Sequence, residues 1–415
     1  MSDRCAPGPT SPVRRGQLPT FRCRHVRVDG PERPADPVPE AGRQGGTPRV
    51  GGLVAAKPSG TAADRRSPTS VCNSHGVELR AHEATLALAE TFTIARTSRR
   101  VQEVVRVELE HERIVGLGEA TPVYYWGETA ESALRFLTAE APGMLGDDPF
   151  ALEAIGRRLA ARPGEQAAKC ALDAALHDWI GRRLGQPVWR LLGLSPTGPP
   201  TSYTIGIDTV EGTADRARRA RGFAVLKVKV GGRDDLARVE AVRRVTRARI
   251  RVDGNEGWTL ETARELIPAL VELGVELVEQ PFPAEDVESF RALRELSARP
   301  PVLVDEGCRD LASVAPIATY ADGINVKLAK TGGLREAVRM IHAARALGLR
   351  VMLGCMIESE LGIAAAAQIA CLADDVDLDG HLLIADLPFT GLGFHGGRVT
   401  PSSDPGLGVR PGHDG

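Results

Sequence analysis

From residue 201 onward, short apolar runs alternate with longer stretches in which apolar residues recur at helical spacing. The short runs are rich in β-branched residues, which is typical of parallel strands buried on both faces. The stretches between them, such as 259–274 and 334–348, end near Gly, as helices often do. The pattern predicts eight strands, over residues 201–205, 225–230, 250–253, 277–279, 302–305, 324–327, 351–354 and near 377–386.

Eight strand–helix units of this length predict an α/β fold of the (β/α)8 barrel type, over residues 199–390. Chargeable residues follow the predicted strands at steps of 24, 26, 26 and 22 residues: Lys229, Asp253, Glu279, Asp305 and Lys327. Active sites of such barrels lie at the carboxyl ends of the strands. All five residues are therefore expected at the face where the chemistry takes place.

Upstream of the barrel the pattern changes to strict alternation, over 77–88 and 104–120, which predicts antiparallel strands. Helical spacing follows over 131–145 and 166–184. Residues 76–198 are therefore expected to form a separate α+β domain that caps the barrel. Residues 391–415 are expected to return to this cap and end in a tail.

Residues 1–75 have a different composition, with 11 Pro and 9 Gly among the first 70 residues and no apolar period. Such a segment cannot bury enough apolar surface to fold alone. One interpretation is a basic arm that binds a partner. The favoured one is a disordered extension, or a translation start placed too far upstream.

Whole-chain composition narrows the class of protein. A length of 415 residues exceeds one typical domain, and 42% hydrophobic content is ordinary for a globular protein. The net charge of −2 gives no reason to expect nucleic acid or an acidic membrane as a partner, and no apolar run reaches the length of a membrane span. Seven dispersed cysteines favour reduced thiols and a cytoplasmic location. We also expect a homo-oligomer of unspecified size.

Three of the strand-end residues are carboxylates on adjacent strands: Asp253, Glu279 and Asp305. Each alone could cap the following helix. Three on consecutive strands instead favour a shared hard cation, and we expect one Mg²⁺ per subunit.

Lys229 and Lys327 come from strands that face each other across a ring of eight. Both lie inside apolar runs, which argues against ordinary surface lysines. Removing a proton beside a carboxylate builds up an enediolate, which a cation stabilises. One lysine can take that proton and the other can return one. Lys227 shares a strand face with Lys229, so like charge, burial and the metal are expected to lower the pKa of Lys229.

At these positions the sequence resembles the enolase superfamily, in its muconate-lactonizing-enzyme-like branch, over roughly residues 77–399. The matching motifs are KVKVG (227–231), DGNEGW (253–258), EQP (279–281), DEG (305–307) and NVKLAKTGG (325–333). Further motifs are similar to those of the dipeptide epimerases in that branch: TSYTIGID (201–208), GCMIES (354–359) and DLDG (377–380). Gly307 and Thr331 stand where family members often carry Ser and Cys.

Asp377 and Asp379 are spaced so that both can face one side of an extended segment, where they could hold an ammonium group. A polar turn would explain the same residues. The resemblance implies that they bind the free α-ammonium group of a dipeptide substrate.

Further residues have less certain roles. Lys227 could bind a substrate carboxylate, tune Lys229 or pair with an acid, and Asn255 could bind a ligand or act behind Asp253. Glu358 could orient Lys327, contact substrate or cap a helix. Lys330 is expected to be a solvated loop charge.

The resemblance therefore implies a Mg²⁺-dependent dipeptide epimerase that inverts the α-carbon of the C-terminal residue of a small dipeptide. One set of alternatives uses the same enediolate: o-succinylbenzoate synthase, N-acylamino acid racemase or a muconate-type cycloisomerase. Another is a non-catalytic ligand-binding relative. Arg96, Arg99 and Arg100 could bind an acidic side chain, as in L-Ala-D/L-Glu, or could face solvent.

Overall fold

The computed structural model describes residues 69–72 and 76–412. Most of the predicted extension, 1–68 and 73–75, lies outside the described residues. Within it, Thr69–Cys72 form strand β1, which pairs antiparallel with β2 (Glu78–Ile94). The expectation of an unfolded segment is wrong for these four residues, because the edge of β2 supplies hydrogen-bond partners that local composition does not reveal.

The cap is an antiparallel sheet in the order β1–β2–β3–β4, packed on helices. Strands β3 (Thr97–His111) and β4 (Ile114–Ala120) follow β2, and the long helix α4 (Gln166–Leu184) packs on β4. A Cβ atom at Gly116 or Gly118 would lie about 2 Å from the carbonyl oxygens of α4, so this close approach requires glycine. The smaller cap helices are η1 (Tyr124–Trp126), α1 (Ala130–Arg135), the π turn η2 (Phe136–Glu140), α2 (Pro142–Leu145), α3 (Leu152–Ala160) and α5 (Val188–Leu191).

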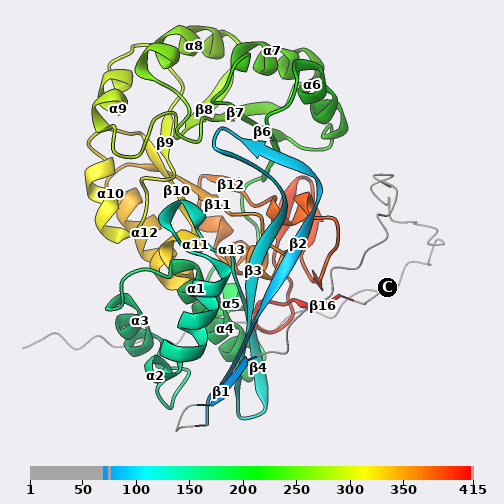
Figure 1. The fold of residues 1–415 in the computed structure, drawn as a ribbon, viewed down its shortest axis with the longest axis vertical. Coiled ribbons are helices and arrows are strands. Elements are labelled where there is room, and N and C mark those ends of the chain that lie inside the picture. The colour runs from blue at the N-terminus through cyan, green and yellow to red at the C-terminus, as the bar shows by residue number, and fades with distance from the viewer. Residues whose placement is uncertain (1–68, 73–75, 413–415) are drawn as a thin grey trace, which may run out of the picture. The chain divides into compact units, whose positions relative to one another are not determined.

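The barrel consists of eight parallel strands, as predicted (Figure 1). They are β5 (Ser202–Ile205), β6 (Val225–Lys229), β7 (Arg249–Asp253), β8 (Val275–Glu279), β9 (Val302–Val304), β10 (Gly323–Lys327), β11 (Arg350–Gly354) and β12 (Asp375–Asp377). A parallel bridge between Thr201 and Val376 joins the first strand to the last and closes the ring. The eighth strand ends at Asp377, so the predicted position near 377–386 is wrong. Residues Gly380–Leu383 form the 3-10 helix η4 instead.

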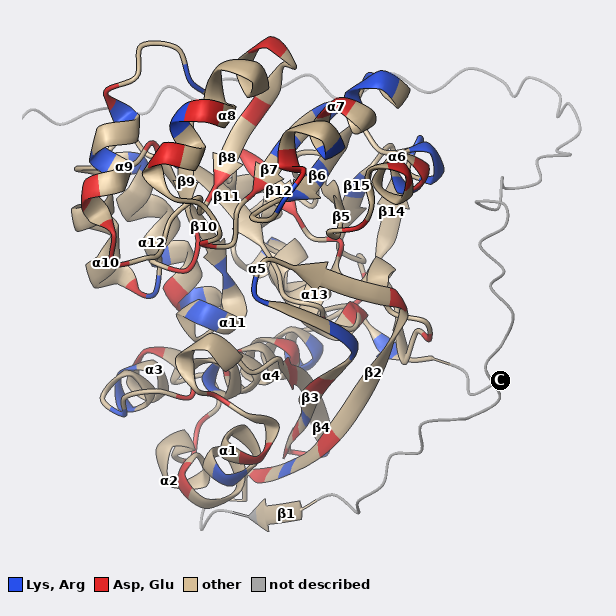
Figure 2. Cartoon of the chain, turned by 45° about the horizontal axis from the view of Figure 1, so that its top comes forward, with Lys and Arg blue, Asp and Glu red and all other residues tan. Residues whose placement is uncertain are grey.

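Helices surround the barrel: α6 (Val210–Arg219), α7 (Asp235–Val245), α8 (Leu260–Glu272), α9 (Val287–Arg294), α10 (Leu311–Ile317), α11 (Leu328–Thr331), α12 (Leu334–Ala346), α13 (Glu360–Ala367) and η3 (Ala370–Leu372). Outward-facing strand residues such as Val228, Val252 and Val326 are fully buried in one core cluster. Figure 2 shows acidic and basic positions interspersed on the outer helices α6 to α10. Within the described residues, no helix is long and apolar enough to span a bilayer.

The interior of the barrel is layered. Leu277, Leu303 and Met352 form a small apolar cluster of their own. Arg251 of β7 and Asp375 of β12 also point into the barrel. Each is 1% exposed, and they form an ion pair at 2.5 Å. Side chains alternate along a strand, so the residues two positions further on project inward at the carboxyl end.

Two of the contacts between the cap and the barrel involve the β2–β3 hairpin and strand β4. The hairpin formed by β2 and β3 runs alongside the carboxyl ends of the strands, where Thr93 O accepts from Ile207 N at 2.8 Å (Figure 1). On β4, the buried carboxylate of Glu119 accepts hydrogen bonds from the backbone N–H and hydroxyl of Ser359. The hairpin therefore lies beside the face at which the predicted site residues end.

The last described residues include short strand pairs, β13 (Phe389–Thr390) with β16 (Arg410–Pro411) and β14 (Gly393–His395) with β15 (Arg398–Thr400). The segment between β15 and β16 contacts helix α4, where Leu407 N donates to Asp178 Oδ1 at 2.7 Å.

Candidate functional site

Strand register brings the predicted residues to one level at the mouth of the barrel. Lys229, Asp253 and Glu279 are direct partners across β6, β7 and β8. Asp305 stands two residues beyond Leu303, the partner of Glu279, and so points to the same side. On the other half of the ring, Lys327 is level with Gly354, which is level with Asp377.

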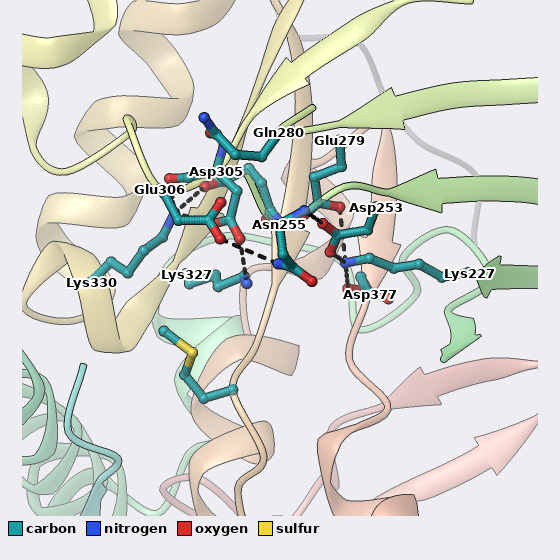
Figure 3. Close-up of polar contacts among 12 residues, drawn as sticks. Lys227, Asp253, Asn255, Glu279, Gln280, Asp305, Glu306, Lys327, Lys330 and Asp377 are labelled. Carbon is teal, nitrogen blue, oxygen red and sulfur yellow. Dashed lines mark hydrogen bonds and ion pairs between the residues drawn. The ribbon is translucent and has the colours of Figure 1, made fainter. Parts of the chain in front are cut away.

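Lys227 is the centre of a buried ion-pair cluster (Figure 3). Its Nζ lies 2.6 Å from Asp377 Oδ2, 2.8 Å from Glu279 Oε2 and 3.1 Å from Asp253 Oδ2. Burial opposes the charge on Lys227, but these carboxylates outweigh burial and raise the pKa of its ammonium group. Lys227 is therefore a fixed positive charge among three acids.

The two predicted acid/base lysines pair with different carboxylates. Lys229 Nζ lies 2.5 Å from Asp253 Oδ2, and Lys327 Nζ lies 2.7 Å from Asp305 Oδ2. Strands β6 and β10 are four positions apart in the closed ring of eight. The two ammonium groups thus reach the mouth from opposite sides, as the spacing predicts.

Charge compensation is uneven among the three carboxylates. Burial would raise the pKa of Asp253, but Lys229 and Lys227 outweigh it and lower this pKa to about 2. Lys327 and Lys330 likewise overcome burial and lower the pKa of Asp305. For Glu279, burial and the neighbouring charge of Asp253 instead raise the pKa to about 7. The site therefore has room for additional positive charge.

The donor chemistry of the site fits a hard divalent cation. The three carboxylates are at most 1% exposed, and further oxygens that have no hydrogen-bond donor, Asn255 Oδ1 and Glu306 Oε2, are buried beside them. An all-oxygen set suits Mg²⁺. Across 69–72 and 76–412, no three His, Cys, Asp or Glu side chains stand in positions that could already hold an ion. In this structure the carboxylate oxygens pair with the lysines.

Lys330 is not the solvated loop charge that the sequence suggests. Helix α11 begins directly after β10 and turns this side chain under Asp305, where it is fully buried. Its Nζ donates to Asp305 Oδ1, to Asp305 O at 2.5 Å and to Asn325 O at 3.0 Å. A compositional signal was available, because only six of the chain's 52 basic residues are lysines and four of the six lie at this site.

Asp377 and Asp379 are both buried near the junction of β12 with β5. Asp377 Oδ1 accepts from the hydroxyl of Ser202 at 2.5 Å, while Asp379 Oδ2 accepts from Thr204 N at 2.5 Å. Burial and the charge of Asp377 raise the pKa of Asp379 to about 7, whereas Lys227 overcomes burial to lower the pKa of Asp377. Among the residues that the structure describes, no ion pair joins a cation to Asp379.

Two other predicted residues have distinct surroundings. The backbone N–H of Asn255 donates to Asp253 Oδ1 at 3.0 Å, and its Nδ2 donates to Glu306 Oε1 at 3.2 Å. Glu358 accepts from Met356 N at 3.0 Å, and burial raises its pKa to about 7. Among the described residues, no ion pair joins Glu358 to Lys327.

Two further residues, Asn325 and Glu306, lie near the carboxylates and were not predicted from the sequence as site residues. Asn325 Nδ2 donates to Glu279 Oε1 at 2.8 Å, and its position two residues before Lys327 on one strand face was a usable signal. Glu306, next to Asp305, accepts a bond at 2.5 Å from Arg96 of the hairpin. Nothing in local sequence indicates that pair, because 210 residues separate its members.

The three arginines of the hairpin do not act alike. Arg96 reaches Glu306 and Glu256 on the barrel and stacks on Tyr125, 5.1 Å from the ring centre. Arg99 donates to Gln102 at 2.6 Å and lies over Tyr124, and Arg100 is exposed. Only Arg96 of the three bonds to the barrel.

Comparisons with known proteins agree with this architecture. The family model for the mandelate racemase / muconate lactonizing enzyme N-terminal domain matches residues 77–193, and the enolase C-terminal domain-like model matches 210–414. The L-Ala-D/L-Glu epimerase of Bacteroides thetaiotaomicron is 40% identical over 328 residues, which are 78% of this chain and 85% of that protein.

Solved structures are also similar over about four fifths of this chain, and two of them are of particular interest. One is a dipeptide epimerase from Enterococcus faecalis V583 complexed with Mg and the dipeptide L-Leu-L-Tyr, which is 31% identical with a TM-score of 0.75 and covers 80% of this chain and 98% of that one. The other is an N-succinyl Arg/Lys racemase from Bacillus cereus, which is 29% identical with a TM-score of 0.77 and covers 80% and 95%.

Replacing Lys330 with Met should destabilise the protein more than replacing Lys327 with Met. Lys330 satisfies three buried acceptors, whereas Lys327 has one carboxylate partner. We expect a loss of about 3 kcal/mol for Lys330→Met, the usual scale for breaking a buried charge pair. Chemical denaturation of both variants measures the difference, and equal stability of Lys330→Met and the unsubstituted protein would contradict the structural role.

Proposed function

Because the chain belongs to the mandelate racemase / muconate lactonizing enzyme group of the enolase superfamily, we propose that it is a Mg²⁺-dependent dipeptide epimerase. It inverts the α-carbon of the C-terminal residue of a dipeptide. The observation that carries the proposal is the placement of Lys229 and Lys327 on opposite sides of three buried carboxylates. One group on each face of a planar intermediate is what inversion requires.

Asp253, Glu279 and Asp305 would hold the metal, one ion per subunit. When bound, Mg²⁺ would supply positive charge that stabilises the negative charge that develops as the α-proton leaves. Asn325 and Asn255 orient Glu279 and Asp253 from behind.

Lys229 and Lys327 exchange the α-proton. One removes it from one face and the other delivers a proton to the opposite face. A lysine must be neutral to accept a proton. Burial opposes the charge on Lys327, yet Asp305 outweighs it and raises this pKa, so Lys327 acts as a base only when its pair with Asp305 is broken. Lys227 stays charged and attracts the substrate carboxylate.

Asp377 and Asp379 receive the α-ammonium group of the dipeptide. Asp379 has a raised pKa and accepts a hydrogen bond from a backbone N–H, but within 69–72 and 76–412 no cation lies at hydrogen-bond distance from it, so an ammonium group would complete its surroundings. This recognition requires a free amino terminus. Glu358 lies at the same rim and lines the substrate space.

The B. cereus relative, an N-succinyl amino acid racemase, keeps a second function open. The same enediolate chemistry would act on an N-acylated amino acid, as it would in a synthase or cycloisomerase. The Asp pair argues against these substrates, which have no α-ammonium group. A non-catalytic relative is disfavoured because both lysines and all three carboxylates are present. We further propose a cytoplasmic homo-oligomer.

Asp253→Asn should weaken Mg²⁺ binding, because one of three anionic ligands is lost. Activity should fall by about three orders of magnitude or more, since the cation stabilises the developing charge. Titration calorimetry with Mg²⁺ alone measures the binding. Excess chelator should abolish the activity of the unsubstituted protein in the same way. Full activity in chelator would exclude the metal-dependent mechanism.

Lys229→Ala and Lys327→Ala should each abolish epimerisation, because each variant lacks the group that transfers the proton on one face of the substrate. Each variant should still exchange the α-proton of the one isomer that faces its remaining lysine. Deuterium uptake from D2O by the separate L,L and L,D dipeptides measures this.

Lys229→Arg and Lys327→Arg are matched controls, since arginine keeps the charge but does not act as a base. They should behave as the alanine variants do. Epimerisation by any of the four variants would refute the two-base arrangement.

An N-acetylated dipeptide should be a poorer substrate than the free one by about 100-fold or more in kcat/KM, the scale for losing a required polar partner in a closed site. Asp379→Asn should shrink this preference while leaving the Lys227–Asp377 pair intact, so it is a cleaner variant than Asp377→Asn. Equal rates on the two substrates would instead support the N-acylamino acid racemase.

A further inference from the structure

The tip of the cap hairpin, residues 92–97, is fitted closely to the rim of the barrel. A Cβ atom at Gly231 would lie 2.8 Å from the Cβ of Ala95, and one at Gly257 would lie 3.0 Å from it. These two glycines follow β6 and β7, the strands that carry Lys229 and Asp253. The tip therefore rests directly on the loops that follow two of the site residues.

Arg96 binds this tip to the barrel through two ion pairs that differ in how far their acidic partners are buried. Its side chain is 25% exposed, and it bonds Glu256, whose side chain is 22% exposed, and Glu306, whose side chain is 3% exposed. An exposed pair contributes little, whereas an acid buried beside Asp305 depends on its cationic partner. The ion pair of Arg96 with Glu306 therefore contributes more to docking of the tip than the pair with Glu256.

The same Glu306 oxygen also holds the loop after β7. Oε1 accepts from Arg96 and from Asn255 Nδ2, and the backbone N–H of Asn255 donates to Asp253 Oδ1 at 3.0 Å. Asn255 and Glu256 have φ values of 43° and 67°, a left-handed pair that needs outside contacts to persist. A continuous chain of polar contacts thus runs from the cap to Asp253.

We propose that Glu306 is a positioning residue that couples docking of the cap hairpin to the orientation of Asp253, through Arg96 on one side and Asn255 on the other. The inference rests on the proposed metal site. By linkage, the coupling is reciprocal: Mg²⁺ binding favours the docked hairpin and the docked hairpin favours Mg²⁺ binding.

The test compares Glu306→Gln, Arg96→Gln and the control Glu256→Gln, with Mg²⁺ as the only added ligand. Glu306→Gln keeps an oxygen for Asn255 but removes the charge that holds Arg96. Arg96→Gln lies on the cap, so it tests the coupling even if the buried substitution impairs folding. Glu256→Gln removes only the more exposed partner of Arg96.

Titration calorimetry should show the Mg²⁺ dissociation constant rising about fivefold or more in Glu306→Gln and Arg96→Gln, the lower end of typical coupling. It should change less than about twofold in Glu256→Gln, as for an exposed pair. Hydrogen exchange in 92–97 should slow when Mg²⁺ is added to the unsubstituted protein, and this response should be lost in the first two variants.

Unchanged Mg²⁺ binding in folded Glu306→Gln and Arg96→Gln would overturn the coupling. An equal effect in Glu256→Gln would overturn the assignment to Glu306. Absence of Mg²⁺ binding in the unsubstituted protein would instead refute the proposed metal site, and the coupling with it.

Discussion

Charge balance among buried side chains at the barrel mouth is the constraint on which the rest of the site depends. Carboxylates removed from water are unstable unless cations or hydrogen-bond donors compensate them. Here Lys227 contacts three acids, and Lys229 shares Asp253 Oδ2 with it. Lys327 and Lys330 pair with the two carboxylate oxygens of Asp305. The raised pKa of Glu279 marks the place where compensation is incomplete. Glu279 is therefore the acid of this cluster at which additional positive charge would be most stabilising.

The barrel makes this concentration of charge tolerable. Outward faces of the strands supply a continuous apolar core, so the inward faces are free to carry polar residues. Below the mouth, the apolar cluster of Leu277, Leu303 and Met352 and the ion pair of Arg251 with Asp375 fill the interior. Since interiors are close-packed, the side chains above have few alternative positions. The rigid strands therefore hold each charged side chain at the level that the register of its strand gives it.

The cap contributes where the barrel is open. Glu119 anchors β4 to Ser359 at the start of α13, and the hairpin tip bears Arg96 toward Glu306. The contact through Glu119 is fully buried, whereas that of Arg96 includes partly exposed groups. The hairpin tip is therefore held to the barrel by ion pairs that water partly reaches.

The sequence by itself determined the barrel, the antiparallel cap, the strand-end carboxylates and the facing lysines. It could do so because strand and helix periods are local and the strand-end rule converts spacing into position. It misplaced the eighth strand, because 381–386 has the apolar composition of a strand but η4 begins at Gly380. Only the tertiary structure decided that Lys330 is buried under Asp305, that Asn325 holds Glu279, and that Arg96 meets Glu306. Lysine usage and strand spacing could have marked Lys330 and Asn325 as candidates, but their partners depend on how a helix turns after a strand or on segments up to 210 residues apart.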